Sequence, residues 1–387
     1  MISDSFSLMR GGPVYRLMHR LGAIKPGVPT APLVAVLLVG VAFVPMVVFA
    51  MQAGMLLPRE DRIALLGDYA VLARLLVAIP VLVFAAAPSD DVLRGAMRYI
   101  GRSGLVPDTE HARFEAIVHR SRALRDSFVP EAVCAIVAIG SAFWTSAHFS
   151  HVSGLMHWAL GTNGALSSAG TWFAWVAAPV FRFVGLIWVW RFLLWAYVLW
   201  RLSRLHLSLH AAHPDGAGGL GFLSPTQARF AVMSFAGGCL ISGDVLVRMV
   251  YAGAQLQQAQ WELLGWILGS TLLVLAPLVC MAPRMVSVRR RGLLDLGALG
   301  QQASGDFDRR WRPTAKEGVD PLLDSGNPST MADFTAMYGT ARSMSMVPVN
   351  RLTFVAVACL SAAPFLPAVL HAISIDELLR RLLGVLA

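Results

Sequence analysis

Seven runs of hydrophobic residues, separated by polar segments, divide the 387-residue chain. They cover residues 31–57, 69–87, 128–149, 172–202, 230–256, 261–282 and 352–373. A helix needs about 20 mostly apolar residues to cross the hydrocarbon layer, and nearly every run reaches that length. The pattern predicts an all-α, multi-pass integral membrane bundle of about seven transmembrane helices.

The polar segments are too short for independent domains. Residues 1–30 precede the six spans within 31–283, residues 284–351 form the longest polar segment, and residues 352–387 hold the last span and a tail. Ser374 and Glu377 suit a capping box that begins an amphipathic tail helix. Residues 304–328 are rich in Gly, Asp and Pro and predict a loop.

Residues 89–127 predict two amphipathic helices that lie along the membrane face or extend the third span. The apolar positions of the first helix are Val92, Leu93, Ala96, Met97 and Ile100, and those of the second are Phe114, Ile117, Val118 and Leu124.

Basic residues gather in alternate segments, and this orients the chain. Residues 1–30, 89–127 and 284–351 are rich in arginine, whereas residues 150–171 and 252–260 contain no lysine or arginine. We therefore predict a cytoplasmic N-terminus and a multi-pass protein of the inner (plasma) membrane. The same distribution of basic residues between spans explains the net charge of +9. These residues form no basic groove motif, which argues against a nucleic-acid partner.

Five charged residues interrupt the runs: Arg74, Arg182, Arg191, Asp244 and Arg248. A charge near the middle of a span costs about 2.5–3.5 kcal/mol on insertion scales, so such residues usually face a bundle interior or a watery cavity. Because four of these residues are arginines and only one is an acid deep in a span, we predict a positively charged pathway for the solute. In the alternative interpretation the arginines reach the membrane interfaces, and Asp244 pairs only with Arg248 at i,i+4.

The loop at residues 211–225 is the most distinctive local pattern. Its characteristic residues are His213, Asp215, Gly216, Gly218, Gly219 and Gly221. Glycines at this density allow backbone N–H groups to form an anion-binding nest, and the next helix would add its positive end. A tight connector between two long helices is the simpler alternative.

Histidines offer two possible cofactor sites. His206, His210 and His213 recur at i, i+4 and i+7 and could bind a metal together with Asp215. His148 and His371 could serve as axial ligands of a haem. Ordinary interfacial histidines, with no cofactor, are the alternative that we favour.

These patterns favour a channel or transporter for a small anionic solute over an enzyme. It would work as a homo-oligomer among membrane lipids, with subunits in contact through Gly237, Gly238 and Gly243. One alternative is an integral-membrane enzyme, lipid-directed or redox, that uses His210, His213 and Asp215. Another is an interaction subunit that binds its partner through cytoplasmic amphipathic helices. A retinal pigment is excluded because no span contains a lysine.

Overall fold

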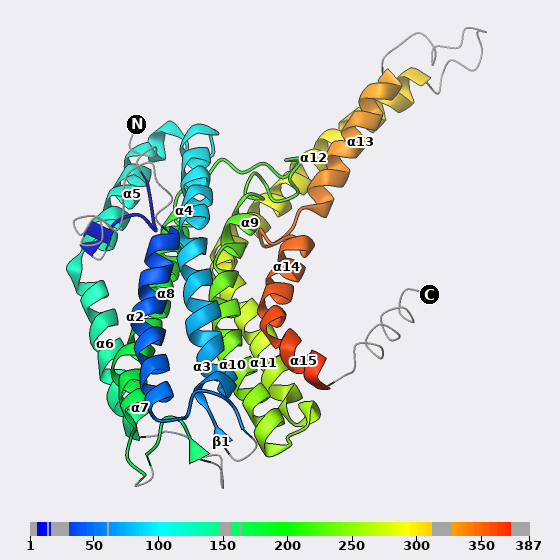
Figure 1. Ribbon diagram of the computed structural model, residues 1–387. Coiled ribbons are helices and arrows are strands. Elements are labelled where there is room, and N and C mark those ends of the chain that lie inside the picture. The colour runs from blue at the N-terminus through cyan, green and yellow to red at the C-terminus, as the bar shows by residue number, and fades with distance from the viewer. Residues whose placement is uncertain are drawn as a thin grey trace.

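The computed structural model describes residues 6–13, 15–16, 31–59, 62–147, 156–161, 164–311 and 327–372. Within them, six helices are long and apolar enough to cross a membrane, and one bent helix pair supplies a seventh candidate. The predicted all-α, multi-pass membrane bundle is therefore confirmed, with six or seven spans (Figure 1).

The first half of the chain supplies three spans and the bent-pair candidate. They are α2, Ala31–Gln52; α3, Tyr69–Leu72, continued by the π-helical turn Ala73–Ala78 and α4, Ile79–Arg102; α5, His111–Asp126, with α6, Phe128–Ala147; and α7, Ser168–Trp172, continued by the π-helical turn Phe173–Ala177 and α8, Ala178–Leu202. The short strands β1, Arg62–Ile63, and β2, Met156–His157, lie in the segments that connect these spans and pair in parallel with each other.

The second half supplies the other three. The first of them follows the short helix α9, Leu223–Ala228, and contains α10, Ala231–Ala252. The second consists of α11, Leu256–Leu275, the 3-10 turn Ala276–Met281 and α12, Ala282–Trp311, and is followed by α13, Asn327–Ser343. The third consists of α14, Arg351–Ala362, the 3-10 turn Ala363–Phe365 and α15, Leu366–Ala372. Consecutive spans run in opposite directions (Figure 1).

Side-chain caps explain where several helices begin. The carboxylate of Asp68 accepts from the backbone N–H of Val71 at 3.1 Å, and the side chain of Asn350 accepts from Thr353 at 2.6 Å. Each cap satisfies an N–H that has no partner within the first turn. At the other end of α10, Gly253 adopts a φ of 65°, a left-handed conformation that glycine adopts without strain.

The predicted end of the second span is wrong, because the helix continues past the apolar run. The second span and the first predicted amphipathic helix form one helix that ends at Arg102. Its predicted apolar positions Leu93, Ala96, Met97 and Ile100 are buried, so packing sustains the helix beyond the membrane. α5, by contrast, extends the third span inward, one of the two arrangements predicted for it, and meets α6 at a bend of 41°.

The sixth span also continues, as α12, through residues 304–311 where a loop was predicted. α13 folds back along α12, and the two helices project from the bundle as a hairpin (Figure 1). The rest of the predicted loop, residues 312–326, and the predicted tail helix lie outside the described residues.

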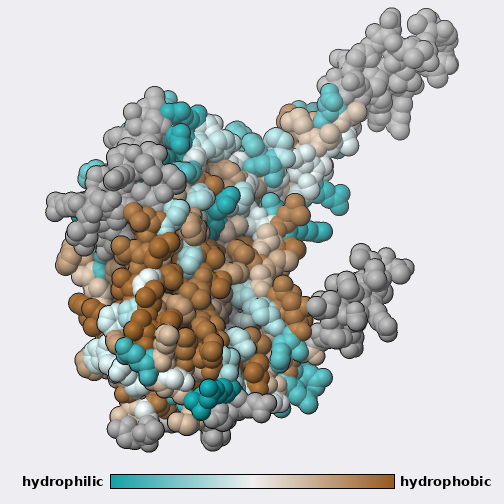
Figure 2. Space-filling view, in the orientation of Figure 1, coloured by the Kyte–Doolittle hydropathy of each residue, from teal (hydrophilic) through white to brown (hydrophobic). Residues whose placement is uncertain are grey.

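The outer surface of the bundle carries a broad apolar region between polar ends (Figure 2). Large apolar side chains such as Ile136, Leu272 and Leu37 are more than half exposed there. A soluble protein does not leave so much apolar surface open, whereas lipid solvates it well. We call the end of the bundle that carries α5, α9 and the α12–α13 hairpin the arginine-rich end.

Candidate functional site

The five predicted intramembrane charges do not converge on one site. Arg191 lies in α8 near the arginine-rich end and pairs with Glu131 of α6. Its Nη2 donates to Oε1 of Glu131 at 2.9 Å and to the carbonyl oxygen of Gly11 at 2.9 Å. Both charged side chains are almost fully buried, at 4% and 3% exposed. The charge of Arg191 is therefore neutralised by Glu131, and the ion pair has a structural role.

Arg248 is also paired. Its Nε lies 3.2 Å from Oδ2 of Asp244, one turn away on α10, and its Nη2 donates to Oε2 of Glu262 on α11 at 2.6 Å. All three side chains are substantially exposed on the outside of the chain. Two carboxylates against one guanidinium make this cluster net negative, so it adds nothing to a positive pathway.

Arg182 has a different environment, because neutral oxygens alone bond to it among the described residues. Its Nη1 donates to the hydroxyls of Ser141 at 2.8 Å and Thr145 at 2.7 Å, and to the carbonyl oxygen of Ser141 at 3.2 Å. Ser141 and Thr145 lie on α6, so this contact joins α6 to α8. At 1.5 Å rise per residue, Arg182 lies about 13 Å from Arg191 along α8.

Arg74 lies on the π-helical turn between α3 and α4 and forms no hydrogen bond or ion pair with any described residue. Its Nε is buried without a partner. Asp68 and Asp244 are the acids whose charge it feels, and it also repels Arg182. Arg74 and Arg182 are therefore the two of these four arginines that bond to no acid among the described residues.

A cavity of about 430 Å³ opens beside Arg182, between α6 and α8 on one side and α10 and α11 on the other. Apolar groups, including Phe181, Trp188 and Trp266, line nearly all of it. Some of its lining residues, such as Val189 and Leu273, are exposed on the lipid-facing surface. The cavity therefore opens sideways toward the hydrocarbon, and Arg182 supplies its charge.

The glycines predicted to form subunit contacts pack inside the chain instead. A side chain at Gly237 would strike the ring of Trp266, one at Gly238 would approach Pro364, and one at Gly243 would strike the backbone of Ala70. Small residues at these positions let α10 approach its neighbours closely. They are packing positions of the bundle, and Gly237 also lines the cavity.

The glycine-rich loop does form a nest of N–H groups, but a carboxylate of the same loop fills it. Oδ1 of Asp215 accepts from the backbone N–H of Ala217 at 2.8 Å and of Gly219 at 3.1 Å, and Oδ2 accepts from Gly221 at 2.8 Å. Burial raises the pKa of Asp215, but these bonds and His213 lower it more, so the net shift is downward. The geometry matches the connector interpretation of this loop.

The predicted metal ligands do not come together. Nδ1 of His206 lies 2.8 Å from Oε1 of Glu110, and Nδ1 of His213 lies 2.8 Å from Oδ1 of Asp215. No group of three or more His, Cys, Asp or Glu residues among those described could hold a metal ion. For the haem hypothesis, His371 lies in the last turn of α15, while His148 lies outside the described residues.

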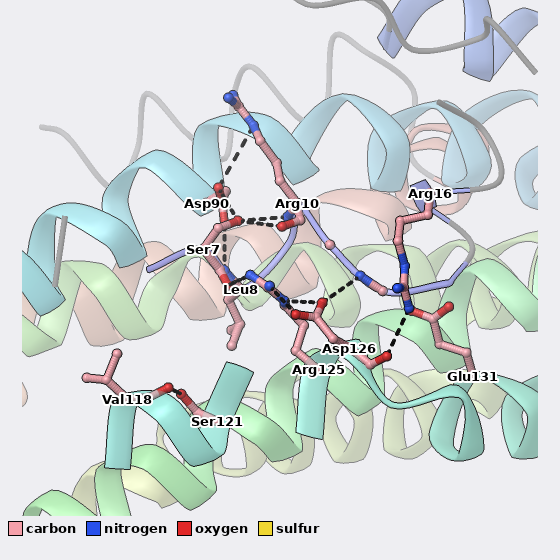
Figure 3. Close-up of polar contacts among 12 residues, drawn as sticks. Ser7, Leu8, Arg10, Arg16, Asp90, Val118, Ser121, Arg125, Asp126 and Glu131 are labelled. Atoms are coloured by element: carbon pink, nitrogen blue, oxygen red, sulfur yellow. Dashed lines mark hydrogen bonds and ion pairs between the residues drawn. The ribbon is translucent and has the colours of Figure 1, made fainter. Parts of the chain in front are cut away.

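Residues 6–13 form a polar clasp at the arginine-rich end that the sequence did not suggest (Figure 3). Asp90 of α4 is fully buried and accepts from the Ser7 hydroxyl at 2.9 Å, from the N–H groups of Leu8 and Met9 at 2.8 Å each, and from Arg94 at 2.6 Å. These bonds satisfy a buried carboxylate that would otherwise be costly.

The same segment is held by α5 on its other side. Arg125 donates to the carbonyl oxygen of Ser7 at 2.6 Å and binds the carboxylate of Asp126 with two nitrogens. Asp126 in turn accepts from the N–H of Gly12 at 3.1 Å (Figure 3). The segment therefore joins α4, α5 and α8, and no local sequence motif signals such long-range contacts.

Comparisons of the chain with protein-family models, curated proteins and solved structures found no match. The geometry of the chain therefore carries the functional argument.

Proposed function

We propose that this protein is a membrane carrier for an anionic amphiphile, a molecule with an acidic head and a hydrocarbon part. The observation that carries the proposal is the apolar cavity with Arg182 in its lining. The volume of about 430 Å³ lies within the range of small-molecule sites. The proposed solute is anionic, as the sequence predicts. The apolar lining of the cavity is the reason for proposing that the solute also has a hydrocarbon part.

The lining favours an amphiphile over a small hydrated ion. A hydrated ion needs polar groups or water along its path, because leaving hydration behind is costly. The cavity presents almost entirely apolar surface, with Arg182 and a few hydroxyl-bearing residues such as Ser141 and Ser270. A hydrocarbon chain gains free energy on such a surface, and an acid group gains a charged partner in Arg182.

The lateral opening suits entry from the lipid phase. α6 forms one wall of the cavity through Val137 and Ser141, and it packs mainly against α8 and the π-helical turn before it. An amphiphile that enters from one leaflet could therefore reach Arg182 without crossing a water-filled pore. This route is the basis of the carrier activity that we propose.

Binding tests the proposal directly, because Trp188 and Trp266 line the cavity. Brominated palmitate should quench the tryptophan fluorescence of the purified protein, and brominated hexadecanol, which has no charge, should bind about tenfold more weakly. Trp188→Phe and Trp266→Phe variants should each remove part of the quenching. Equal affinity for the acid and the alcohol would contradict the proposal.

Arg182→Gln should lower the affinity for palmitate to that for the alcohol. Arg201→Gln is the matched control, because Arg201 lies at the exposed end of the same helix. Carrier activity is measured in proteoliposomes as protein-dependent movement of a headgroup-labelled anionic lipid between leaflets. Arg182→Gln should reduce this movement, and Arg201→Gln should leave it unchanged.

A further inference from the structure

We infer that Gly185 and Phe192 set the length of the hydrocarbon chain that the cavity accepts, and that this length is about 12 carbons. This inference rests on the proposed function, since it specifies the apolar part of the same amphiphile. The observation behind it is the position of Arg182 at one end of the cavity, with apolar and aromatic lining residues following it along α8.

Arg182 lies at the end of the cavity farther from the arginine-rich end. Phe181 and Arg182 are the first lining residues of α8, and Phe192 is the last. The helix runs toward the arginine-rich end, where α9 follows it (Figure 1). The guanidinium points the other way, because it bonds to Ser141 and also to Thr145, one turn farther along the oppositely directed α6. From an acid group at Arg182, the cavity therefore extends toward the arginine-rich end.

Gly185 leaves a path for the chain next to Arg182. Arg182, Gly185 and Val189 lie at i, i+3 and i+7, so they share one face of α8, and all three line the cavity. A Cβ at Gly185 would meet nothing within 4 Å, whereas a Cβ at Gly237 would strike Trp266. Close packing therefore explains the glycine at 237. Gly185 instead borders the open space of the cavity, and a larger side chain there would enter that space.

Phe192 closes the cavity toward the arginine-rich end. Its ring packs edge-on against that of Phe230, with 5.4 Å between the ring centroids, and the residue is 7% exposed. One turn farther along α8, the indole of Trp195 donates to the buried Gln227, whose amide nitrogen donates to the carbonyl oxygen of Val274. These polar groups satisfy one another, so this end of the cavity suits the apolar end of a chain.

The distance from Arg182 to Phe192 limits the length of the chain. At 1.5 Å rise per residue, the two residues lie about 15 Å apart along α8. An extended chain advances about 1.2 Å per bond, one third of the roughly 3.6 Å that an extended polypeptide covers with three backbone bonds. About 12 carbons therefore fill the distance. A shorter chain leaves part of the apolar wall without contacts, and a longer chain must bend or leave through the lateral opening.

A series of fatty acids in the fluorescence assay tests this length. Octanoate, dodecanoate and palmitate displace the brominated palmitate, and their affinities are compared at equal mole fractions in the detergent. Dodecanoate should bind about tenfold more tightly than either of the other acids. Equal affinities of the three acids would overturn the inference and leave the proposed function intact. Failure of every acid to bind would overturn the proposed function itself.

A variant at Gly185 tests the path. Gly185→Leu should weaken dodecanoate binding by about tenfold or more, because the new side chain fills the space beside Arg182. Gly40→Leu is the matched control, since a Cβ at this glycine of α2 also meets nothing within 4 Å. It should bind dodecanoate like the unaltered protein. Unchanged binding in Gly185→Leu, or an equal loss in Gly40→Leu, would contradict the role of Gly185.

Two variants test the closed end. Phe192→Ala should move the preference from dodecanoate toward palmitate, because the cavity then extends toward Trp195. Loss of a buried ring also destabilises a core, so Met233→Ala is a second variant. Met233 is the first lining residue of α10, which begins near the arginine-rich end, and its truncation should move the preference in the same direction. An unchanged preference for dodecanoate in every one of these variants that folds would overturn the inference.

Discussion

Arg191 of α8 and Glu131 of α6 form a 2.9 Å ion pair that is almost completely shielded from solvent. The second nitrogen of the guanidinium, Nη1, is buried without a partner among the described residues. A buried pair of this kind contributes little net stability, but either charge alone is strongly unfavourable. The pair therefore fixes how α6 meets α8 and bears no free charge for a ligand.

The first prediction follows from this asymmetry. Glu131→Leu or Arg191→Met alone should lower the free energy of unfolding in detergent by about 3–5 kcal/mol, because each leaves an uncompensated buried charge. The double variant should be more stable than either single variant. A double-mutant cycle by thermal unfolding measures this coupling, and additive losses would contradict the assignment.

A second prediction concerns the close approach of the N-terminal clasp to this pair. Gly12 has a φ of +93°, and an added Cβ would overlap Oε1 of Glu131 and lie 3.0 Å from Nη2 of Arg191. Gly12→Ala should therefore release residues 6–13 and make Arg10 more accessible to trypsin. Gly95→Ala is the control, since a Cβ at this helical position meets nothing within 4 Å. It should stabilise α4 by about 0.5–1 kcal/mol.

A third prediction concerns pH and the glycine-rich loop. The pKa of Asp215 lies below its ordinary value when the protein is folded. A lowered folded pKa stabilises the loop at pH values above the unfolded pKa, and this stabilisation is lost as the pH falls through the folded pKa. The protection of the Gly219 and Gly221 amides against hydrogen exchange, relative to their intrinsic exchange rates at each pH, should therefore stay high at neutral pH and fall only in strong acid.

Asp215→Asn should show fast exchange at these glycines already at neutral pH, because the amide accepts fewer hydrogen bonds and bears no charge. Asp295→Asn, at an exposed position of α12, is the matched control and should leave the exchange unchanged. Slow exchange in Asp215→Asn would show that another group holds the loop.

The sequence predicted the spans well, because the length and apolarity of a membrane helix are local properties. It also predicted the buried face of α4 beyond the membrane, since the positions of Leu93, Ala96, Met97 and Ile100 follow the helical period. It placed helix ends too early at Ala87 and Ser304. Hydropathy marks where the membrane ends, whereas packing decides where a helix ends.

The partners of the intramembrane arginines were harder to predict. Glu131 and Glu262 lie near span ends, where an acid resembles an ordinary interfacial residue, so the sequence suggested one deep acid against four arginines. The structure leaves Arg74 and Arg182 as the arginines without an acid partner among these four. The contacts of residues 6–13 with Asp90 bridge more than 80 residues of sequence, and no periodic pattern records them.

The last prediction concerns the wall of the cavity. Hydrogen bonds to a charged group contribute about 1.5–3 kcal/mol each, so Ser141→Ala with Thr145→Val should destabilise the junction of α6 and α8 by several kcal/mol. The loss should largely disappear in an Arg182→Met background, because no charge then needs the hydroxyls. Thr335→Val, which removes an exposed hydroxyl bonded within α13, should have little effect in either background. If the loss persists with Arg182→Met, the hydroxyls stabilise α6 by packing, and Arg182 is not what binds this wall to the bundle.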